Sequence, residues 1–298
     1  MTRKPTIHGE LMKLSLILSL LILSSGAFAN RPLKKLFPVK QSIIAALMIH
    51  GNFKGEDDLE VQKAIDTAFS QIKILEDHGV EAALFEFSLG GILYPRINKT
   101  QMENMTTIMT EIVKRSHSVV IGVEILWHYP KKTLKLAVDS GSKFVRLDFF
   151  VDEMFADKKL VPIDPVSLMK YKKRIGGEDV YLFTDIQVKY ALMKDTTKKM
   201  KTSATEAKHY GSDGVIVSGR KSGMPPSARR LKSARIDDKS FPVIQGSGFS
   251  YLNAEKLFPH VDAVIVGTSI STKTGGELVP AKVKKLMSRI IKLRSLSK

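Results

Sequence analysis

The sequence predicts an α/β protein folded as a single (β/α)8 barrel, in which eight parallel strands alternate with eight helices. Apolar runs of strand length alternate eight times with segments of helical period. No linker or shift in composition divides this array. The last two apolar runs end in turns of small residues, which is where such barrels bind phosphate. An open, doubly wound sheet is the alternative arrangement, and the unbroken count of eight favours the closed barrel.

The first 29 residues have the pattern of a secretory signal peptide. A basic opening precedes the apolar run 14–23, and the small residues that end at Ala29 resemble a cleavage site. The run is short for a membrane span. We therefore expect cleavage after Ala29 and export to the periplasm or out of the cell. The alternatives are a buried first helix and an uncleaved anchor that keeps the protein at a membrane; translation could start at Met1 or at Met12.

Beyond the signal peptide we expect a linker over residues 30–42 and one barrel domain over residues 43–298. That length suits a barrel of about 250 residues. Strands are predicted at residues 43–50, 82–87, 119–126, 144–150, 180–188, 214–217, 242–245 and 263–266. Helices are predicted at residues 59–78, 99–115, 131–140, 165–175, 204–210, 227–236, 251–258 and 280–293.

Strand alternation separates side chains that face the barrel interior from those that face the helices. In the fifth strand, the alternate positions from Val180 to Val188 form a nearly apolar face that suits the helices. The opposite face holds Tyr181, Phe183, Asp185 and Gln187, with Lys189 just beyond the strand. Its charged side chains therefore point inward near the C-terminal ends of the strands, where barrel active sites lie.

The same alternation in the other strands gives an inward set of ionisable residues. In the fourth strand, Val145, Leu147 and Phe149 face outward. The inward set is His50, Glu86, Glu124, Arg146, Asp148, Asp185 and Lys189. Buried charge is costly unless it is paired or used, so the set is either a layer of interior ion pairs, such as Arg146 with Asp148 or Glu124, or an active site. Its size and its place opposite a phosphate site favour an active site.

The candidate catalytic residues are Asp185, Lys189, Arg146, Asp148, Glu124 and Glu86. Lys189 could shuttle a proton, form a Schiff base or hold a substrate anion, and Asp185 could keep it charged or act as a base. Arg146 could stabilise developing negative charge. The four carboxylates could also surround a divalent ion such as Mg²⁺. No compact motif requires such an ion, so we assign no metal ligand and leave the cofactor unknown.

The candidate phosphate site consists of two turns. Gly246-Ser247-Gly248 follows the seventh strand and Gly267-Thr268-Ser269 follows the eighth, and each presents backbone N–H groups ahead of a predicted helix. The loop 218–227, which contains Gly219 and Gly223, should lie beside them over the barrel mouth.

The charge of the chain favours an anionic partner. It has 47 Lys and Arg residues against 30 Asp and Glu residues, a formal net charge of +17. The lysines cluster on predicted helices without interleaved aromatic residues, so we expect a small anionic ligand and no nucleic acid. The last helix has a basic face that could lie on an anionic membrane surface, but its apolar stripe favours packing on the barrel. The chain has no cysteine, which excludes disulfides and a thiol nucleophile.

The sequence resembles the BtpA/SgcQ family, named for a photosystem I biogenesis protein and grouped with the ribulose-phosphate-binding barrels. The resemblance extends from residue 43 to about residue 292. Its motifs are ALMIHG, LEDHGVEAALFE, IGVEIL, KFVRLD, FTDIQVKYA, DGVIVSG followed by Gly223 and Pro225, VIQGSGF and AVIVGTSIS. The resemblance implies the same barrel, with Asp185, Lys189 and both terminal glycine turns kept. Because barrels of this kind often self-associate, we also expect a homo-oligomer.

The chain departs from the family pattern around the first four strands. Residues 51–55 replace a proline-rich loop, and Phe87 replaces an asparagine. The third strand ends with Glu124, Trp127, His128 and Tyr129 instead of an asparagine-rich segment. Asp148 replaces an asparagine, and Gln187 and Tyr190 replace histidines.

The sequence therefore predicts a barrel that binds a small phosphorylated, sugar-like ligand after strands seven and eight, with aldolase- or isomerase-type chemistry. The alternative is a non-catalytic exported or membrane-associated assembly factor with a degenerate active site. The altered third strand and the export signal favour this alternative, because phosphorylated sugars are scarce outside the cytoplasm.

Overall fold

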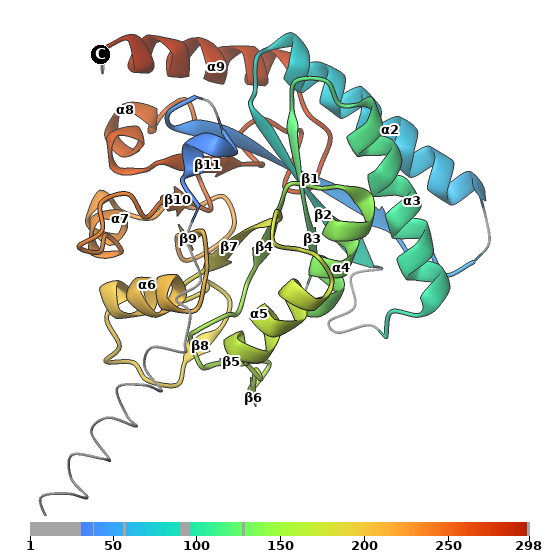
Figure 1. Cartoon of the computed structure of the whole chain (residues 1–298). Coiled ribbons are helices and arrows are strands. Elements are labelled where there is room, and N and C mark those ends of the chain that lie inside the picture. Colours follow the sequence, from blue (N-terminus) through green and yellow to red (C-terminus); the bar gives the residue numbers. More distant parts are fainter. Residues whose placement is uncertain (1–30, 38, 56–57, 90–95, 127–128, 297–298) are drawn as a thin grey trace, which may run out of the picture.

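Eight parallel strands form a closed barrel in the order β1, β2, β3, β4, β7, β9, β10 and β11, with β11 pairing back onto β1 (Figure 1). The computed structural model describes residues 31–296 except residues 38, 56–57, 90–95 and 127–128. The strands are β1 (Ser42–Gly51), β2 (Ala82–Leu89), β3 (Val120–Ile125), β4 (Phe144–Leu147), β7 (Tyr181–Asp185), β9 (Gly214–Val217), β10 (Val243–Gln245) and β11 (Ala263–Val266). The closed barrel is confirmed, and all eight predicted strands are present.

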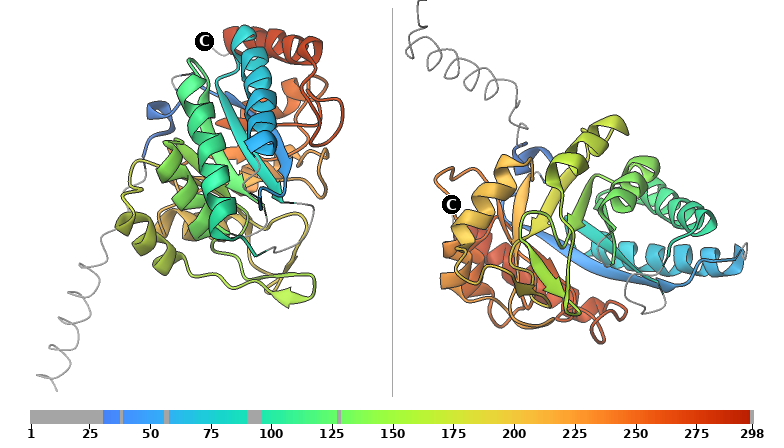
Figure 2. Two further views of the ribbon diagram at one scale, coloured as in Figure 1. Left: turned by 90° about the vertical axis from the view of Figure 1, so that its right-hand side faces the viewer. Right: turned by 90° about the horizontal axis from the view of Figure 1, so that it is seen from below.

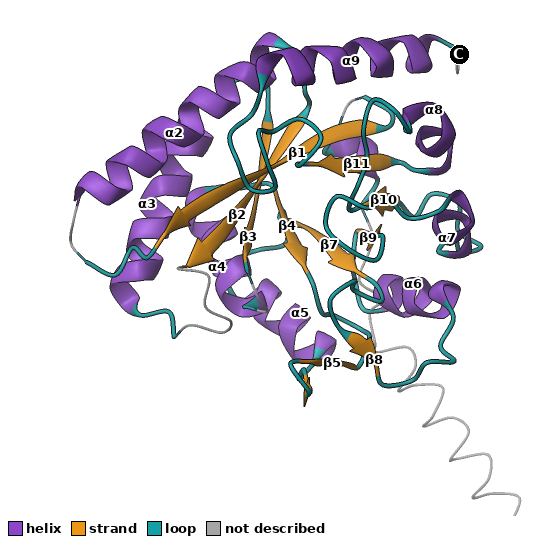
Figure 3. Ribbon diagram, turned by 180° about the vertical axis from the view of Figure 1, so that it is seen from behind, coloured by secondary structure: helices purple, strands orange, loops and turns teal. Residues whose placement is uncertain are grey.

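The helices cover the outside of the barrel, so that the strands lie at its centre (Figure 3). They are α2 (Asp58–Asp77), α3 (Lys99–Arg115), α4 (Pro130–Ser140), α5 (Pro165–Arg174), α6 (Met200–His209), α7 (Ala228–Ser233), α8 (Ala254–Leu257) and α9 (Pro280–Ser295). Local sequence accounts for their ends. The side chain of Asn98 caps α3 in a capping box with Gln101, and Pro165 begins α5 after the Asp164 cap.

The strands separate two apolar layers, as the alternation predicted. Val145 and Leu182 belong to the outer layer between strands and helices. The inner layer fills the barrel below its mouth and includes Tyr181, Phe183 and Leu84. Strands in α/β barrels bury both faces, so the charged residues that share the inner face lie above this apolar plug.

The segment before β1 closes the bottom of the barrel. We expected a linker over residues 30–42, but Phe37 is only 2% exposed and its ring lies 5.8 Å from the Phe144 ring. Arg31 pairs with Asp213 at 2.9 Å and lies over the Tyr181 ring at 3.7 Å. A 3₁₀ turn, η1 (Leu33–Lys35), connects these contacts. Leu36 and Phe37 of this segment are therefore part of the inner apolar cluster of the barrel. The predicted signal peptide lies outside the described residues.

A small antiparallel sheet of β5 (Met154–Ala156), β6 (Lys159–Leu160) and β8 (Leu192–Met193) was not predicted (Figure 1). Two predicted strands end earlier than expected, before the segments that form this sheet. Strand β4 ends at Leu147, so Phe149 packs with Val188 in a third apolar cluster instead of facing the outer layer. Strand β7 ends at Asp185, and Gln187, two residues later, takes a φ of 48°, which is not extended backbone.

The last helix packs against the barrel. Its buried stripe is Val283, Leu286, Met287 and Ile290, and it lies beside α2 and α8 (Figures 1 and 2). Within the part of the chain that the structure describes, no helix combines the length and the apolar character needed to cross a membrane.

Candidate active site

The inner side chains at the C-terminal ends of the strands form a ring with two unlike halves. Strands β2, β3, β4 and β7 contribute the charged residues Glu86, Glu124, Arg146 and Asp185. On the other side, Ser218, Gly246 and Gly267 directly follow the ends of β9, β10 and β11, and Ala46 lies in the middle of β1. Both Gly267 and Ala46 are only half-buried, so solvent reaches the interior on the small-residue half.

Arg146 lies at the centre of the charged half. Its Nε donates to Asp185 Oδ2 at 2.8 Å, and its Nη1 donates to Glu86 Oε1 at 3.0 Å. Asp148 Oδ1 and Glu124 Oε2 lie farther away, at 3.8 and 3.7 Å from the guanidinium. The sequence-predicted residues therefore meet, and the interior ion pairs and the candidate active site are one cluster.

Two carboxylates of the cluster keep an oxygen without a hydrogen-bond partner. Glu124 is 2% exposed and Asp148 is 5% exposed, yet Glu124 Oε2 and Asp148 Oδ2 have no partner among the described residues. Buried polar atoms are almost always paired in folded proteins. These two oxygens are consequently the atoms of the cluster that remain available to a ligand.

Burial sets the protonation of the cluster. It raises the pKa of Glu86 and Asp185, while the nearby Arg146 charge opposes the rise. The pKa of Glu124 is raised well above its usual value by burial and then by the neighbouring charge of Asp148. Burial would lower the pKa of Arg146, but the four carboxylates outweigh it and raise that pKa well above the usual range. The cluster therefore combines a permanent cation with carboxyl groups that hold protons readily.

Lys189 and Tyr190 approach the cluster from the loop after β7. Lys189 lies close enough to lower the pKa of both Glu86 and Asp185. Tyr190 as a whole residue is 36% exposed; its ring lies 6.1 Å from the Phe149 ring, and its hydroxyl is hydrogen-bonded to Asp148. Burial, followed by the charge of Asp148, raises the pKa of that hydroxyl well above its usual value.

Gln187 does not face the interior, contrary to the alternation prediction. Its Nε2 donates to the Lys198 carbonyl at 3.0 Å, and its own carbonyl accepts from Arg230 Nη2 at 3.3 Å. Arg230 Nε also donates to the Ser218 carbonyl at 3.2 Å. Arg230 thus ties the loops after β7 and β9 together.

The two glycine turns offer fewer backbone donors than the sequence predicted. The amide of Gly246 donates to the Val217 carbonyl, and the amide of Gly219 donates to Ser247 Oγ. Those two N–H groups are therefore occupied. Across the described residues, no acceptor is paired with the amides of five turn residues, Ser247, Gly248, Gly267, Thr268 and Ser269. The N–H groups of Gly248, Thr268 and Ser269 are therefore among those that remain for an anion.

Gly219 and Gly248 have a packing role that the sequence did not reveal. A Cβ on either residue would overlap the backbone of Met224 and Pro225. Gly248 also has a φ of +66°. Gly223, with a φ of +75°, lies beside Thr268, whose methyl group would be 3.9 Å from an added Cβ. The loops after β9, β10 and β11 are therefore packed closely over one side of the mouth.

The turns and the charged half are in contact through Ser218. Its Oγ lies 3.4 Å from Asp185 Oδ1, and a Cβ on Gly246 would come within 2.6 Å of the same Oγ. Sequence analysis missed Ser218, although alternation from the inward Ile216 would have placed it on the inner face. It also gave no role to Tyr190, because its contact with Asp148 depends on the turn after β7.

We expected each turn to lead directly into a helix, but neither turn does. After Gly248, the Asn253 side chain donates to the Gly248 carbonyl, and α8 begins only at Ala254. After Ser269, a bridge between Ser271 and Leu278 precedes α9. An anion at these turns would be held by loop amides.

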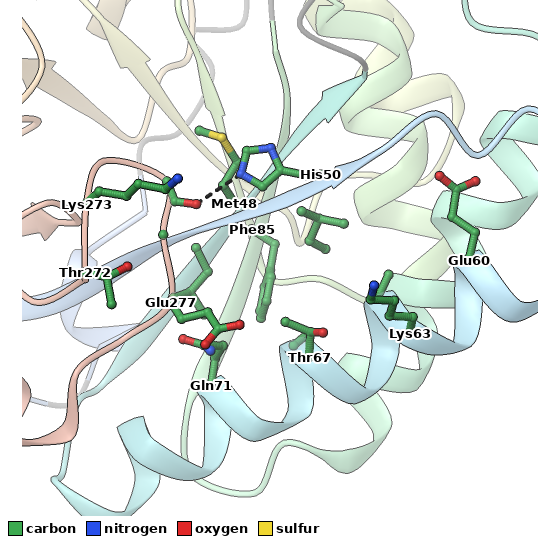
Figure 4. Close-up of a pocket in the computed structure, with 16 residues that line it drawn as sticks. Met48, His50, Glu60, Lys63, Thr67, Gln71, Phe85, Thr272, Lys273 and Glu277 are labelled. Carbon is green, nitrogen blue, oxygen red and sulfur yellow. Dashed lines mark hydrogen bonds between the residues drawn. The ribbon is translucent and has the colours of Figure 1, made fainter.

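A cavity of about 610 Å³ lies beside the mouth (Figure 4). Strand β1 pairs with β11 only over residues 42–45, although it pairs with β2 as far as Gly51. The cavity lies at this unpaired edge, between α2 and the loop after β11. His50 bridges the gap, since its Nε2 lies 3.0 Å from the Gly275 carbonyl (Figure 4). His50 thus stays outside the Arg146 cluster, in contrast to the other six inward residues.

No group of three or more acidic or histidine side chains has metal-binding geometry within the described ranges. Arg146 occupies the centre of the carboxylates, where an Mg²⁺ ion was considered.

Comparison with known proteins places this fold in a family. The family model described as BtpA matches residues 43–292. The chain belongs to the BtpA family. An uncharacterised protein of Archaeoglobus fulgidus is 27% identical over 228 residues, which cover 76% of this chain and 89% of that protein. The photosystem I biogenesis protein BtpA of Synechocystis is 30% identical over 170 residues, which cover 56% of this chain and 58% of that protein.

Solved structures show the same fold at low identity. Phosphoribosyl anthranilate isomerase from Thermus thermophilus has a TM-score of 0.52 and 14% identity, covering 85% of this chain and 100% of that chain. The native KDPGal structure has a TM-score of 0.53 and 11% identity, covering 87% and 97%. At these identities the likeness establishes the (β/α)8 barrel alone.

Asp148 and Tyr190, which the resemblance led us to expect as departures from the family pattern, are hydrogen-bonded to each other in the site. Two others, Trp127 and His128, lie outside the described residues.

Proposed function

We propose that this BtpA-family barrel binds a small phosphorylated, sugar-like ligand across its mouth and catalyses proton transfer on it. The observation that carries the proposal is the division of the ring. One half holds buried acids and Arg146, and the other holds small residues beneath loops with unoccupied amides. A phosphate at the amides of Gly248, Thr268 and Ser269 would leave the carbon chain pointing at the acids.

The cluster suits isomerase- or aldolase-type chemistry. In an isomerisation, a carboxylate such as Asp185 removes a proton from the carbon beside a carbonyl group, and Lys189 gives a proton to the carbonyl oxygen, which forms an enediol. The carboxyl group then gives its proton to the former carbonyl carbon, while the neighbouring hydroxyl returns a proton to Lys189. Arg146, which stays charged, would stabilise the negative charge that develops on that oxygen. In the aldolase alternative, Lys189 forms the Schiff base.

A thermal-shift screen of sugar phosphates tests the binding claim. A ligand that binds only the folded state raises the melting temperature. We expect Thr268→Glu to abolish the shift, because the added carboxylate repels phosphate beside the unoccupied amides. Thr107→Glu, at an exposed position of α3, should keep it. The proposal fails if no sugar phosphate shifts the wild type, or if Thr268→Glu responds like Thr107→Glu.

The second candidate function is that of a membrane-associated assembly factor; the name of the Synechocystis relative, photosystem I biogenesis protein, supports a role in biogenesis. The small sheet favours it, since Phe155, Leu160 and Leu192 are exposed there beside Lys158 and Lys159. Apolar side chains with adjacent cations suit an anionic lipid surface. This candidate predicts co-sedimentation with phosphatidylglycerol vesicles that weakens in high salt and with Leu192→Asp. Absence of the protein from the pellet at low salt would exclude it.

A further inference from the structure

The unpartnered oxygens of Glu124 and Asp148 mark a second part of the mouth, distinct from the phosphate turns. Both residues lie on the inner face, at the ends of adjacent strands β3 and β4. Both are more than nine-tenths buried, and each keeps one oxygen without a partner among the described residues. Both carboxyl groups lie close to the Arg146 guanidinium, at 3.7 Å for Glu124 and 3.8 Å for Asp148. The structure thus provides, in one cluster, two buried acceptor oxygens that have no hydrogen-bond partner among the described residues.

The charges around these oxygens decide what can bind them. Glu86, Glu124, Asp148 and Asp185 surround one guanidinium, and Lys189 is the further cation near them. Acidic groups therefore outnumber the cations, so a second anionic group of a ligand would be repelled here. A hydroxyl group both donates and accepts a hydrogen bond, so it satisfies an ionised carboxylate and a protonated carboxyl alike. An alkyl group would leave both oxygens buried and unpaired, which is costly.

We propose that Glu124 and Asp148 form a hydroxyl-recognition site, at which two neighbouring hydroxyl groups of the ligand donate to Glu124 Oε2 and Asp148 Oδ2. The ligand class is then a phosphorylated polyol or sugar. This inference rests on the proposed function, because it assumes that the phosphate lies at the turns. Tyr190 lies beside the proposed site, since it is hydrogen-bonded to Asp148 and its ring lies 6.1 Å from the Phe149 ring.

Calorimetric titration of the protein with three probes tests the inference. The probes are ribitol 5-phosphate, n-pentyl phosphate of the same chain length without hydroxyls, and inorganic phosphate. For the wild type we expect ribitol 5-phosphate to bind at least about tenfold more tightly than n-pentyl phosphate, because hydrogen bonds to charged groups discriminate strongly. In Glu124→Met/Asp148→Leu this ratio should fall to about one. Inorganic phosphate should bind wild type and variant equally.

Apolar replacements suit this test because they remove the two oxygens that have no hydrogen-bond partner among the described residues, while Asp185 and Glu86 continue to pair with Arg146. Circular dichroism checks the fold. If the double variant does not fold, Glu124→Gln and Asp148→Asn each serve with a smaller expected fall. Glu153→Met is the matched control, since Glu153 is an exposed carboxylate that pairs with Lys194 outside the cluster. It should keep the wild-type ratio.

The outcomes separate this inference from the proposed function. Equal binding of ribitol 5-phosphate and n-pentyl phosphate, or a ratio that survives in the double variant, overturns the hydroxyl site while phosphate binding stands. Absence of binding by all three probes overturns both.

Discussion

Arg146 is the buried cation that balances part of the carboxylate charge inside this barrel. It hydrogen-bonds Asp185 and Glu86, while Glu124 and Asp148 stand farther off. Removing one partner from a buried ion pair costs about 3–5 kcal/mol, because the remaining charge is stranded. The ion pairs of Arg146 with the carboxylates therefore contribute to the stability of the fold as well as to any chemistry. Titration of these carboxylates should change the free energy of unfolding.

Glu124→Gln should change how stability depends on pH. The folded protein raises the pKa of Glu124 above its unfolded value, so this group favours folding below the unfolded pKa and loses that contribution as pH rises through the folded pKa. Glutamine does not titrate. The free energy of unfolding of the variant, relative to wild type, should therefore increase from pH 4.5 to pH 8 in urea titrations. A relative stability that stays flat or falls over this range would contradict the assignment.

The glycines of the mouth allow the effect of close packing on stability to be separated from the effect of a positive φ. Gly248→Ala would combine a positive φ with an overlap on Met224 and Pro225, whereas Gly223→Ala has a positive φ and no close neighbour. We expect Gly223→Ala to lose about 1–2 kcal/mol of unfolding free energy. The overlap at Gly248 should add about 1–3 kcal/mol more. Equal losses in urea unfolding would mean that the loops are not packed as described.

At the scale of elements, the segment before β1 is the part whose role the sequence least revealed. Its apolar content is small, and only the closed barrel creates the space that Phe37 fills between Phe144 and Phe183. Phe37→Ala should lower the free energy of unfolding by about 3–5 kcal/mol, as for other buried phenylalanines. Leu33→Ala, at a half-buried position in the same segment, is the control and should cost less. A similar small loss in both variants would show that the segment does not close the barrel.

The barrel strands were predictable because each is an apolar run between loop residues, and the helices because of their periodicity. Strand ends were less predictable. The prediction for residues 180–188 continued the alternation past Asp185, whereas tertiary contacts turn Gln187 toward Lys198. Strands β5, β6 and β8 are too short to give a pattern. Long-range pairing decides such segments, and local sequence does not carry it.

For the molecule as a whole, the alternation of side chains along the strands predicted that residues far apart in the sequence, from Glu86 to Asp185, form the charged half of the site. It could not show which atoms are already bonded. The amides of Gly246 and Gly219 are occupied, and the unused oxygens of Glu124 and Asp148 emerge only from the folded contacts. The alternation pattern thus predicted which residues line the site, whereas the structure was needed to identify their free hydrogen-bond donors and acceptors.

The central claim is that the two halves of the ring hold the two ends of one phosphorylated ligand. A crystal structure of the protein with ribitol 5-phosphate tests it most directly. We predict phosphate oxygens within about 3 Å of the amides of Gly248, Thr268 and Ser269, with the hydroxyl chain directed at Glu124 and Asp148. An empty mouth at saturating ligand, or phosphate bound instead in the cavity between Lys63 and Lys273 (Figure 4), would contradict the claim.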